Sequence, residues 1–252
     1  MAEKIFAISW SRRNPNIYRE MFKSSGKNNP QILLITHATE EKEKPTSTYD
    51  RMYNFFYPAL DLERPNIQLL TRDELRDDKK VEEKLSQSDI IYICPGSISP
   101  VINLWKTYNF DCRLKEFLKS GKLLAGISSS AGCLFKSFTT KHNNSYSLKG
   151  GLGLVDAHFS CYGQYKESQE YFREMLELIK GYGILLTDNI GVLIEDGKYR
   201  IITSNGERYN LVGYNNEVYA IVAHYEEKYN ESEKLYYTTQ QPEELKKLLK
   251  KR

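Results

Sequence analysis

Short apolar runs alternate with amphipathic segments along the first half of the chain. Five runs have the length and β-branched character of buried strands, at residues 4–10, 31–36, 67–71, 89–94 and 123–128. Segments with helical periodicity separate them, at residues 16–23, 48–60, 73–87 and 101–119. Because these strands are apolar on both faces, the pattern predicts an α/β fold whose mostly parallel sheet is flanked by helices on both faces.

The second half of the chain has a looser pattern. A polar stretch follows Phe135, and a helix is expected across residues 167–179. From about residue 190 the alternating segments and turn residues indicate β hairpins, and a short helix from Pro242 closes the chain. We therefore expect one α/β domain over residues 1–252, with an antiparallel β extension near the C-terminus.

Composition excludes several classes of function. With 36 basic and 33 acidic residues, the net charge of +3 is too small to indicate nucleic acid or an anionic membrane as a partner. The N-terminus lacks the layout of a signal peptide, and no apolar run approaches the roughly 18 residues of a membrane span. We therefore expect a cytoplasmic protein. The four cysteines have no C-x-x-C spacing, so neither a zinc site nor a disulfide framework is indicated.

The stretch "GISSSAGCLF", residues 126–135, places three serines where a predicted strand gives way to a predicted helix at 131–138. In the G-x-S-x-G nucleophile elbow, a serine occupies such a turn, and small neighbours allow the turn to close. With Ser130 as the nucleophile the pattern is Ser-x-Ser-x-Gly, in which Ser128 replaces the first glycine. A serine that only caps a core helix explains the same residues, so both interpretations remain open.

A serine nucleophile needs a base, and the sequence has four histidines. His37 follows a predicted strand, His142 lies in a polar stretch, His224 ends a late strand and His158 stands beside Phe159. The residues alone do not decide among them.

The order of four segments, "ICPGSISP", "LLAGISSSAG", "GLGLVDAHF" and "LLTDNIGVLIEDG", resembles the aspartyl dipeptidase (peptidase E) and cyanophycinase family of serine peptidases. The resemblance extends from about residue 4 to 202 and is most specific over 90–197. It implies the class I glutamine amidotransferase-like fold. It also implies Ser130 as nucleophile, His158 as base and Asp188 as the acid that orients the base. Asp156 and Glu195 are alternatives for the acid.

The same resemblance implies an oxyanion hole formed by the backbone N–H groups of Gly96 and Ala131. Gly96 is suited to a close approach to substrate, whereas Pro95 has no N–H to donate. No metal or organic cofactor is expected.

The sequence departs from the family pattern in three places. Residues 95–98, Pro-Gly-Ser-Ile, replace the usual Gly-Gly-Asn-Thr loop, and Asp188 replaces the usual glutamate. The family's arginine for a substrate aspartate is also unmatched: Ser168 falls near its position, and Arg173 lies about a turn further along. Specificity for an N-terminal aspartate is therefore not predicted.

These features predict a serine peptidase that hydrolyses a small peptide or amide through an acyl-enzyme, as a monomer or homodimer. The alternative is a catalytically silent homologue with a binding or regulatory role, favoured by the altered loop and the missing arginine. A cysteine-dependent amidotransferase-like enzyme is a weaker third hypothesis, because the predicted elbow holds Ser130 and Cys133 lies further along the helix.

Overall fold

The computed structural model describes the side chains and backbone of most of the chain up to residue 203. The described ranges are residues 3–10, 15–40, 42, 44–60, 66–143, 145–179 and 181–203, together with the later strands at 213–214, 217–218, 220–226 and 234–237. The predicted helix from Pro242 lies outside the described residues.

The main sheet has seven strands in the order β11-β10-β1-β5-β4-β2-β3. The strands β1, β5, β4, β2 and β3 are mutually parallel, whereas β10 and β11 add an antiparallel edge. Their bounds are β1 (Lys4–Ile8), β2 (Ile32–Ile35), β3 (Ile67–Leu70), β4 (Ile90–Ile93), β5 (Leu123–Ile127), β10 (Ile190–Glu195) and β11 (Lys198–Thr203). The predicted parallel sheet is confirmed, with strand ends within a few residues of those expected.

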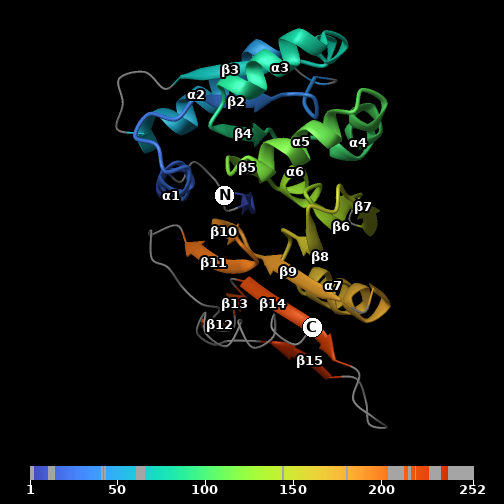
Figure 1. Cartoon of the computed structure of the whole chain (residues 1–252). Helices are drawn as coiled ribbons and strands as arrows, with labels where there is room; N and C mark the ends of the chain where they lie inside the picture. Colours follow the sequence, from blue (N-terminus) through green and yellow to red (C-terminus); the bar gives the residue numbers. More distant parts are fainter. Residues whose placement is uncertain are drawn as a thin grey trace.

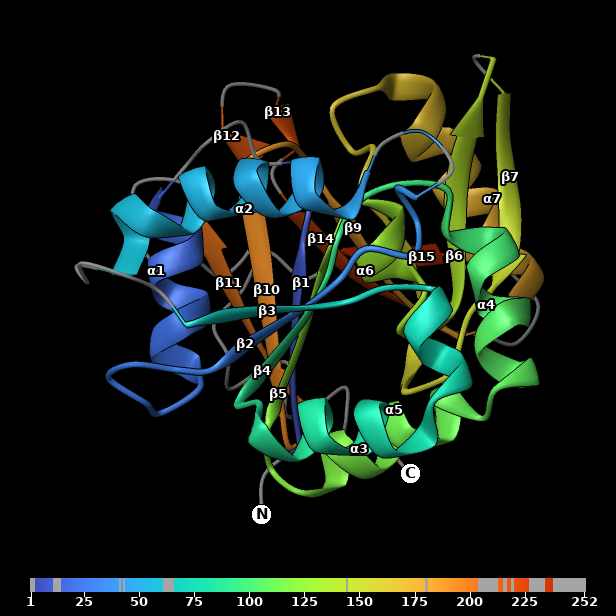
Figure 2. The ribbon, with the colours of Figure 1, turned by 90° about the horizontal axis from the view of Figure 1, so that it is seen from above.

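Helices cover both faces of this sheet (Figure 2). The helices α1 (Pro15–Ser24) and α2 (Pro45–Leu60) lie on one face, and α3 (Asp78–Gln87), α4 (Ile98–Thr107) and α5 (Phe110–Lys119) lie on the other. The period-2 alternation of each strand explains the two layers: Phe6 of β1 packs under α1 and α2, whereas its neighbour Ile5 packs in the opposite cluster. The two-sided apolar pattern of the strands thus follows from two separate cores.

A second sheet of six strands lies beside the main one, in the order β15-β14-β9-β8-β6-β7 (Figure 1). Its strands are β6 (Phe135–His142), β7 (Ser145–Gly150), β8 (Val155–Ser160), β9 (Tyr182–Leu186), β14 (Ala220–Glu226) and β15 (Lys234–Tyr237). The helix α7 (Lys166–Ile179) joins β8 to the parallel strand β9. The short strands β12 (Gly213–Tyr214) and β13 (Glu217–Val218) form a separate pair.

Three local predictions differ from the structure. The predicted helix at 131–138 is only the single turn α6 (Ser129–Gly132), after which the chain becomes β6. The polar stretch after Phe135 is the hairpin β6–β7, whose exposed residues hide the strand pattern. The predicted helix at 73–87 is divided into the 3-10 turn η1 (Asp73–Arg76) and α3, because Asp77 has extended backbone and caps α3 through its side chain.

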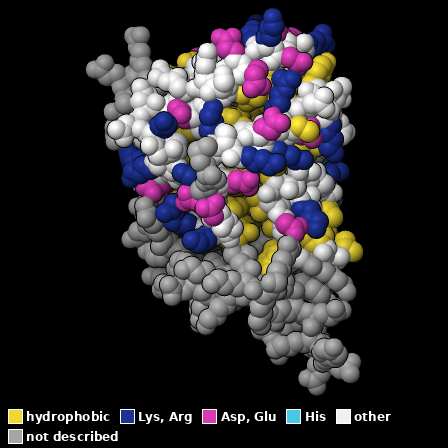
Figure 3. All heavy atoms as spheres, viewed as in Figure 1, with side chains coloured by type: hydrophobic (Ala, Val, Ile, Leu, Met, Phe, Trp, Pro, Cys, Tyr) yellow, Lys and Arg dark blue, Asp and Glu magenta, His cyan; other side chains and the backbone are white. Residues whose placement is uncertain are grey.

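Charge is distributed without a single-sign patch on the face shown in Figure 3, where basic and acidic side chains are interspersed over the described surface. None of the described helices has the length and apolar character needed to cross a membrane.

Candidate active site

The turn between β5 and α6 has a strained backbone at its first serine. Ser128 has φ 55° and ψ −134°, a conformation that residues other than glycine rarely adopt. Its N–H donates to the Ile8 carbonyl at 2.8 Å, and its own carbonyl accepts from the N–H groups of Ala131 and Gly132. Its side chain makes no capping hydrogen bond to the helix and is only half-buried. Helix capping therefore does not explain this serine.

Ser130 lies two residues further along, inside α6, and points away from the turn. Its side chain is completely buried, and its Oγ donates to the Cys94 carbonyl at 2.8 Å. Here Ser130 ties α6 to the end of β4. A buried hydroxyl engaged in this way has no access to a substrate.

His158 also differs from the predicted arrangement. Its Nδ1 is hydrogen-bonded to Ser137 Oγ at 3.0 Å and its Nε2 to Thr139 Oγ1 at 2.9 Å, both on β6. The imidazole is fully buried and packs near Phe172 of α7, and burial lowers the pKa of His158 to about 4. The structure therefore does not bring Ser130 and His158 together, since each side chain is bonded to other partners.

The acidic candidates lie in different places. Asp188 follows β9, is half-buried, and its Oδ1 accepts from Gln164 Nε2 at 3.1 Å. Asp156 is exposed on β8 and pairs with Lys136 at 3.0 Å, and Glu195 pairs with Lys4 at the far end of β10. Of the three, Asp188 is bonded to Gln164, in the segment after β8 that also contacts the serine turn.

The two predicted oxyanion donors, the N–H groups of Ala131 and Gly96, differ in whether they already make a hydrogen bond. The Ala131 N–H is taken, since it donates to the Ser128 carbonyl at 3.0 Å. Gly96 has φ 148° and is exposed, and a Cβ there would lie 2.1 Å from the Ala38 carbonyl oxygen. Glycine is therefore required at this position, because the Ala38 backbone leaves no room for a side chain. Among the described residues, the N–H groups of Gly96 and Ser129 have no hydrogen-bond acceptor.

The neighbour of Ser128 is a thiol. Cys161 Sγ lies 3.6 Å from Ser128 Oγ, and Tyr162 OH lies 3.4 Å from Ser129 Oγ. Both residues come directly after β8. The turn therefore meets the end of the second sheet at the carboxyl end of β5, where ligands commonly bind in α/β proteins.

A family comparison agrees with this arrangement of strands and turn. A sequence model of Peptidase family S51 matches residues 5–202. The chain belongs to peptidase family S51. One curated relative is the uncharacterized peptidase YgaJ of Bacillus subtilis (strain 168), 28% identical over 146 residues, which are 58% of this chain and 60% of the relative. The chain thus aligns with less than two thirds of that relative's length.

Solved structures of similar fold include further peptidases. A crystal structure of a peptidase from an acI-B1 Actinobacterium matches with a TM-score of 0.58 and 12% identity, covering 94% of both chains. A protein of Listeria monocytogenes EGD-e that carries the name peptidase E matches with a TM-score of 0.57 and 14% identity, covering 81% of this chain and 99% of that one. At these identities the likeness shows the fold, which is peptidase E-like.

Within this S51 chain, sequence reasoning missed Ser128 and Cys161. The spacing Gly126-Ile127-Ser128 carries the first half of the G-x-S-x-G pattern and could have identified Ser128. A Cβ on Gly126 would lie 2.8 Å from the Ser130 carbonyl oxygen, so the turn requires glycine there. Cys161 carries no comparable signal in the sequence.

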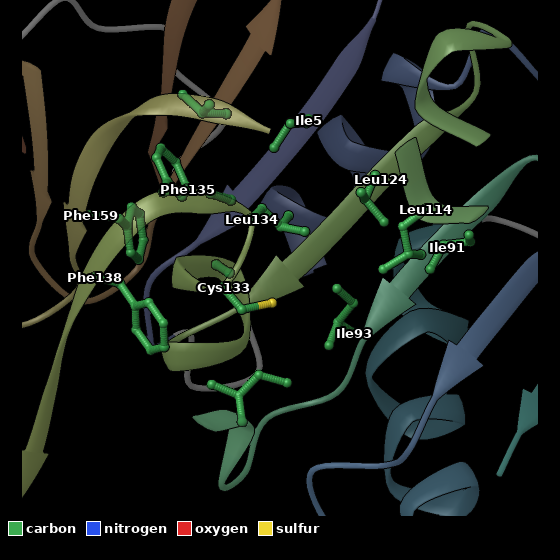
Figure 4. Packing of buried hydrophobic residues seen from close by; sticks show 14 of the residues in the cluster. Ile5, Ile91, Ile93, Leu114, Leu124, Cys133, Leu134, Phe135, Phe138 and Phe159 are labelled. Atoms are coloured by element: carbon green, nitrogen blue, oxygen red, sulfur yellow. The ribbon is translucent and has the colours of Figure 1, made fainter. Parts of the chain in front are cut away.

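Two further residues considered in the sequence, Cys133 and Ser168, are buried. Cys133 lies in the core beside Phe138, and its thiol points toward Ile93 (Figure 4). It donates to the Ser130 carbonyl at 3.1 Å, and burial raises the pKa of its thiol well above the usual range. Ser168, near the expected arginine position, is buried on α7, and its Oγ has no partner among the described atoms. Neither side chain is exposed to solvent.

Proposed function

We propose that the protein is a serine-type peptidase that hydrolyses a small peptide or related amide, with Ser128 rather than Ser130 as its nucleophile. The observation that carries this proposal is the strained backbone of Ser128 at a strand-to-helix turn. Membership of a peptidase family supports the reaction class.

The surroundings of Ser128 support acyl transfer. Attack of Ser128 Oγ on a carbonyl carbon places negative charge on the carbonyl oxygen. The Ser129 N–H, directly after the nucleophile at the start of α6, and the Gly96 N–H in the loop after β4 are donors without an acceptor in the described part of the chain. We assign the oxyanion hole to these two groups, so Gly96 keeps its predicted role and Ser129 replaces Ala131.

A peptide-binding protein without turnover is the second candidate. It is favoured by one observation: the side chain in contact with Ser128 is the thiol of Cys161 and not an imidazole. Removal of a triad member leaves substrate binding and the oxyanion hole in place, and with them a residual rate. Both candidates therefore use the same turn and the same class of ligand.

Labelling with a fluorophosphonate probe tests the nucleophile. We expect slow labelling of the wild-type protein that maps to Ser128 by peptide mass spectrometry and is lost in Ser128→Ala. Ser130→Ala, a matched substitution two residues away, should keep the label while losing about 1 kcal/mol of stability, because its hydrogen bond to Cys94 is removed.

Label found on Ser130, or label that survives Ser128→Ala, contradicts the assignment of the nucleophile. Hydrolysis of a peptide library, measured with the same two variants, then separates the two functions. Cleavage that depends on Ser128 supports the peptidase, whereas peptide binding without cleavage supports the second candidate.

A further inference from the structure

The side chain of Ser128 contacts the thiol of Cys161. The two atoms are 3.6 Å apart, and either group can donate the hydrogen bond. Cys161 is buried, whereas Ser128 is half-buried, so the thiol lies on the protein side of the serine. In a serine hydrolase this is where the general base is expected, within reach of the nucleophile.

The end of the second sheet holds Cys161 in this position. The Gly163 N–H donates to the Leu186 carbonyl at 2.9 Å, so the chain just after Cys161 is tied to the end of β9. A Cβ on Gly163 would meet the Leu186 backbone at 3.0 Å, which explains the glycine. The hydroxyl of Tyr162 also contacts Ser129 Oγ in the serine turn. The contacts of the next two residues, Tyr162 and Gly163, therefore fix the position of Cys161.

A carboxylate, Asp188, follows the strand next to β8, where an acid would be needed to orient an imidazole at position 161. Asp188 follows β9, which pairs with β8 immediately before Cys161. Burial, with a smaller contribution from the negative charge of Asp188, raises the pKa of the Cys161 thiol to about 11, against the lowering effect of hydrogen bonds with Ser128 and Tyr162. Gln164, three residues after Cys161, donates through its Nε2 to Asp188 Oδ1 at 3.1 Å, so the carboxylate lies beside the chain segment that carries Cys161.

Histidines do not occupy this place among the side chains that the structure describes. His37 accepts from Trp105 Nε1 at 2.8 Å, His142 is exposed near the tip of the β6–β7 hairpin, and His158 is bonded to β6. The backbone of His224 pairs with Tyr182, at the opposite end of β9 from Leu186. The imidazoles that the structure describes, those of His37, His142 and His158, make no hydrogen bond to Ser128.

We propose that Cys161 occupies the general-base position beside Ser128, and that this thiol limits the reactivity of Ser128 near neutral pH. This inference rests on Ser128 being the nucleophile. It assigns to Cys161 the role that the sequence predicted for His158, whereas the charge of Asp188 disfavours the thiolate and would orient a base only if that base were an imidazole.

The proton transfers follow from this placement. The thiolate of Cys161 takes the proton of Ser128 as the Ser128 oxygen bonds to the carbonyl carbon, and the resulting thiol gives that proton to the leaving nitrogen as the C–N bond breaks. Water then attacks the acyl ester and loses its proton to the thiolate. That proton returns to Ser128 Oγ as the ester bond breaks, and the thiolate is regenerated. The supply of thiolate controls the rate, because the neutral thiol accepts no proton.

Replacement of the thiol by imidazole tests the proposal. Cys161→His should raise the rate of fluorophosphonate labelling at pH 7.5 by about 10²-fold or more, since a positioned base of suitable pKa contributes about 10²–10⁴-fold. The gain should vanish in Ser128→Ala/Cys161→His and fall at least about tenfold in Cys161→His/Asp188→Asn. Cys112→His adds a histidine at an exposed cysteine of α5 and should leave the rate unchanged.

A folded Cys161→His protein that labels no faster than wild type overturns the proposal, with folding judged from circular dichroism and Tm. If that variant does not fold, the smaller substitution Cys161→Ala decides. It should slow labelling at pH 9 about tenfold or more, and an unchanged rate rejects a role for the thiol. The proposed function is judged separately, by Ser128-dependent peptide hydrolysis in the wild-type protein.

Discussion

The free energy of unfolding is expected to fall by on the order of 4 kcal/mol between pH 6.5 and pH 4.5, because two buried histidines are held neutral in the folded chain. Burial lowers the pKa of His37 to about 3 and that of His158 to about 4, from an ordinary value of 6.5. Protons therefore bind first to the unfolded chain. This contribution to stability is complete above about pH 7 and is lost as the pH falls toward the folded-state values.

The hydrogen bonds of the two histidines support this expectation. His37 Nδ1 accepts from Trp105, and its Nε2 has no partner in the described structure. His158 is bonded at both nitrogens to hydroxyl groups. Neither imidazole has a carboxylate hydrogen-bonded to it that would stabilise a second proton.

Carboxylates titrate in a lower range. Partial burial alone would raise the pKa of Glu74, but hydrogen bonds from Lys80 and Lys84 bring it down to about 2. The stability that Glu74 contributes is fully present above about pH 4.5 and is lost as the pH falls from there toward 2. Glu74 therefore does not account for a loss of stability between pH 6.5 and 4.5.

Urea unfolding at closely spaced pH values measures this effect. The slope of stability against pH should approach about 2.7 kcal/mol per unit near pH 5 in wild type and about half of that in His158→Gln, whose amide can still bond Ser137 and Thr139. His142→Gln removes an exposed histidine from the β6–β7 hairpin and should leave the slope unchanged. Equal slopes in wild type and His158→Gln would contradict the account.

Most of the fold could be predicted from the sequence because the strands of the main sheet are buried on both faces. The parallel strands β1 and β5 are apolar along their length, so their pattern does not depend on distant partners. The hairpin β6–β7 was missed for the opposite reason. Its second strand is exposed or half-buried throughout, and its place is set by pairing with β6 rather than by apolar periodicity.

The position of the nucleophile could not be fixed from small residues alone. Three consecutive serines fit an elbow equally well by composition, but only Ser128 has positive φ, a property of the backbone. Ser130 lies inside the helical turn α6, where its side chain is buried and donates to the Cys94 carbonyl.

Strand alternation explains why the predicted base His158 is hydrogen-bonded to β6 and not to the serine turn. Successive residues of β8 face opposite sides, so His158 lies near Phe172 of α7 while Phe159 stacks on Phe135. Cys161 comes after the strand has ended and is carried to Ser128 by the turn. A histidine beside phenylalanine in the sequence does not reveal on which side of a sheet the imidazole lies.

The rate of Ser128 acylation is expected to rise about tenfold for each pH unit between pH 7 and pH 10, a total of about 10³-fold, because the thiolate of Cys161 is scarce below its pKa of about 11. The titratable groups that act on this thiol are Asp188 and Tyr162, and burial raises the pKa of Tyr162 to about 12, so the phenol stays protonated over this range. His158, with its pKa of about 4, stays neutral. The rise therefore reports the thiol.

Fluorophosphonate labelling rates from pH 7 to 10 measure this profile, with circular dichroism at each pH to confirm the fold. Cys161→His should give a profile that levels off above about pH 7.5, since an imidazole is already neutral there. Ser128→Ala supplies the background rate. A wild-type profile that stays flat would show that the thiol does not take the serine proton. An equal rise in Cys161→Ala would assign the pH dependence to hydroxide instead, and the position beside Ser128 would then hold no base.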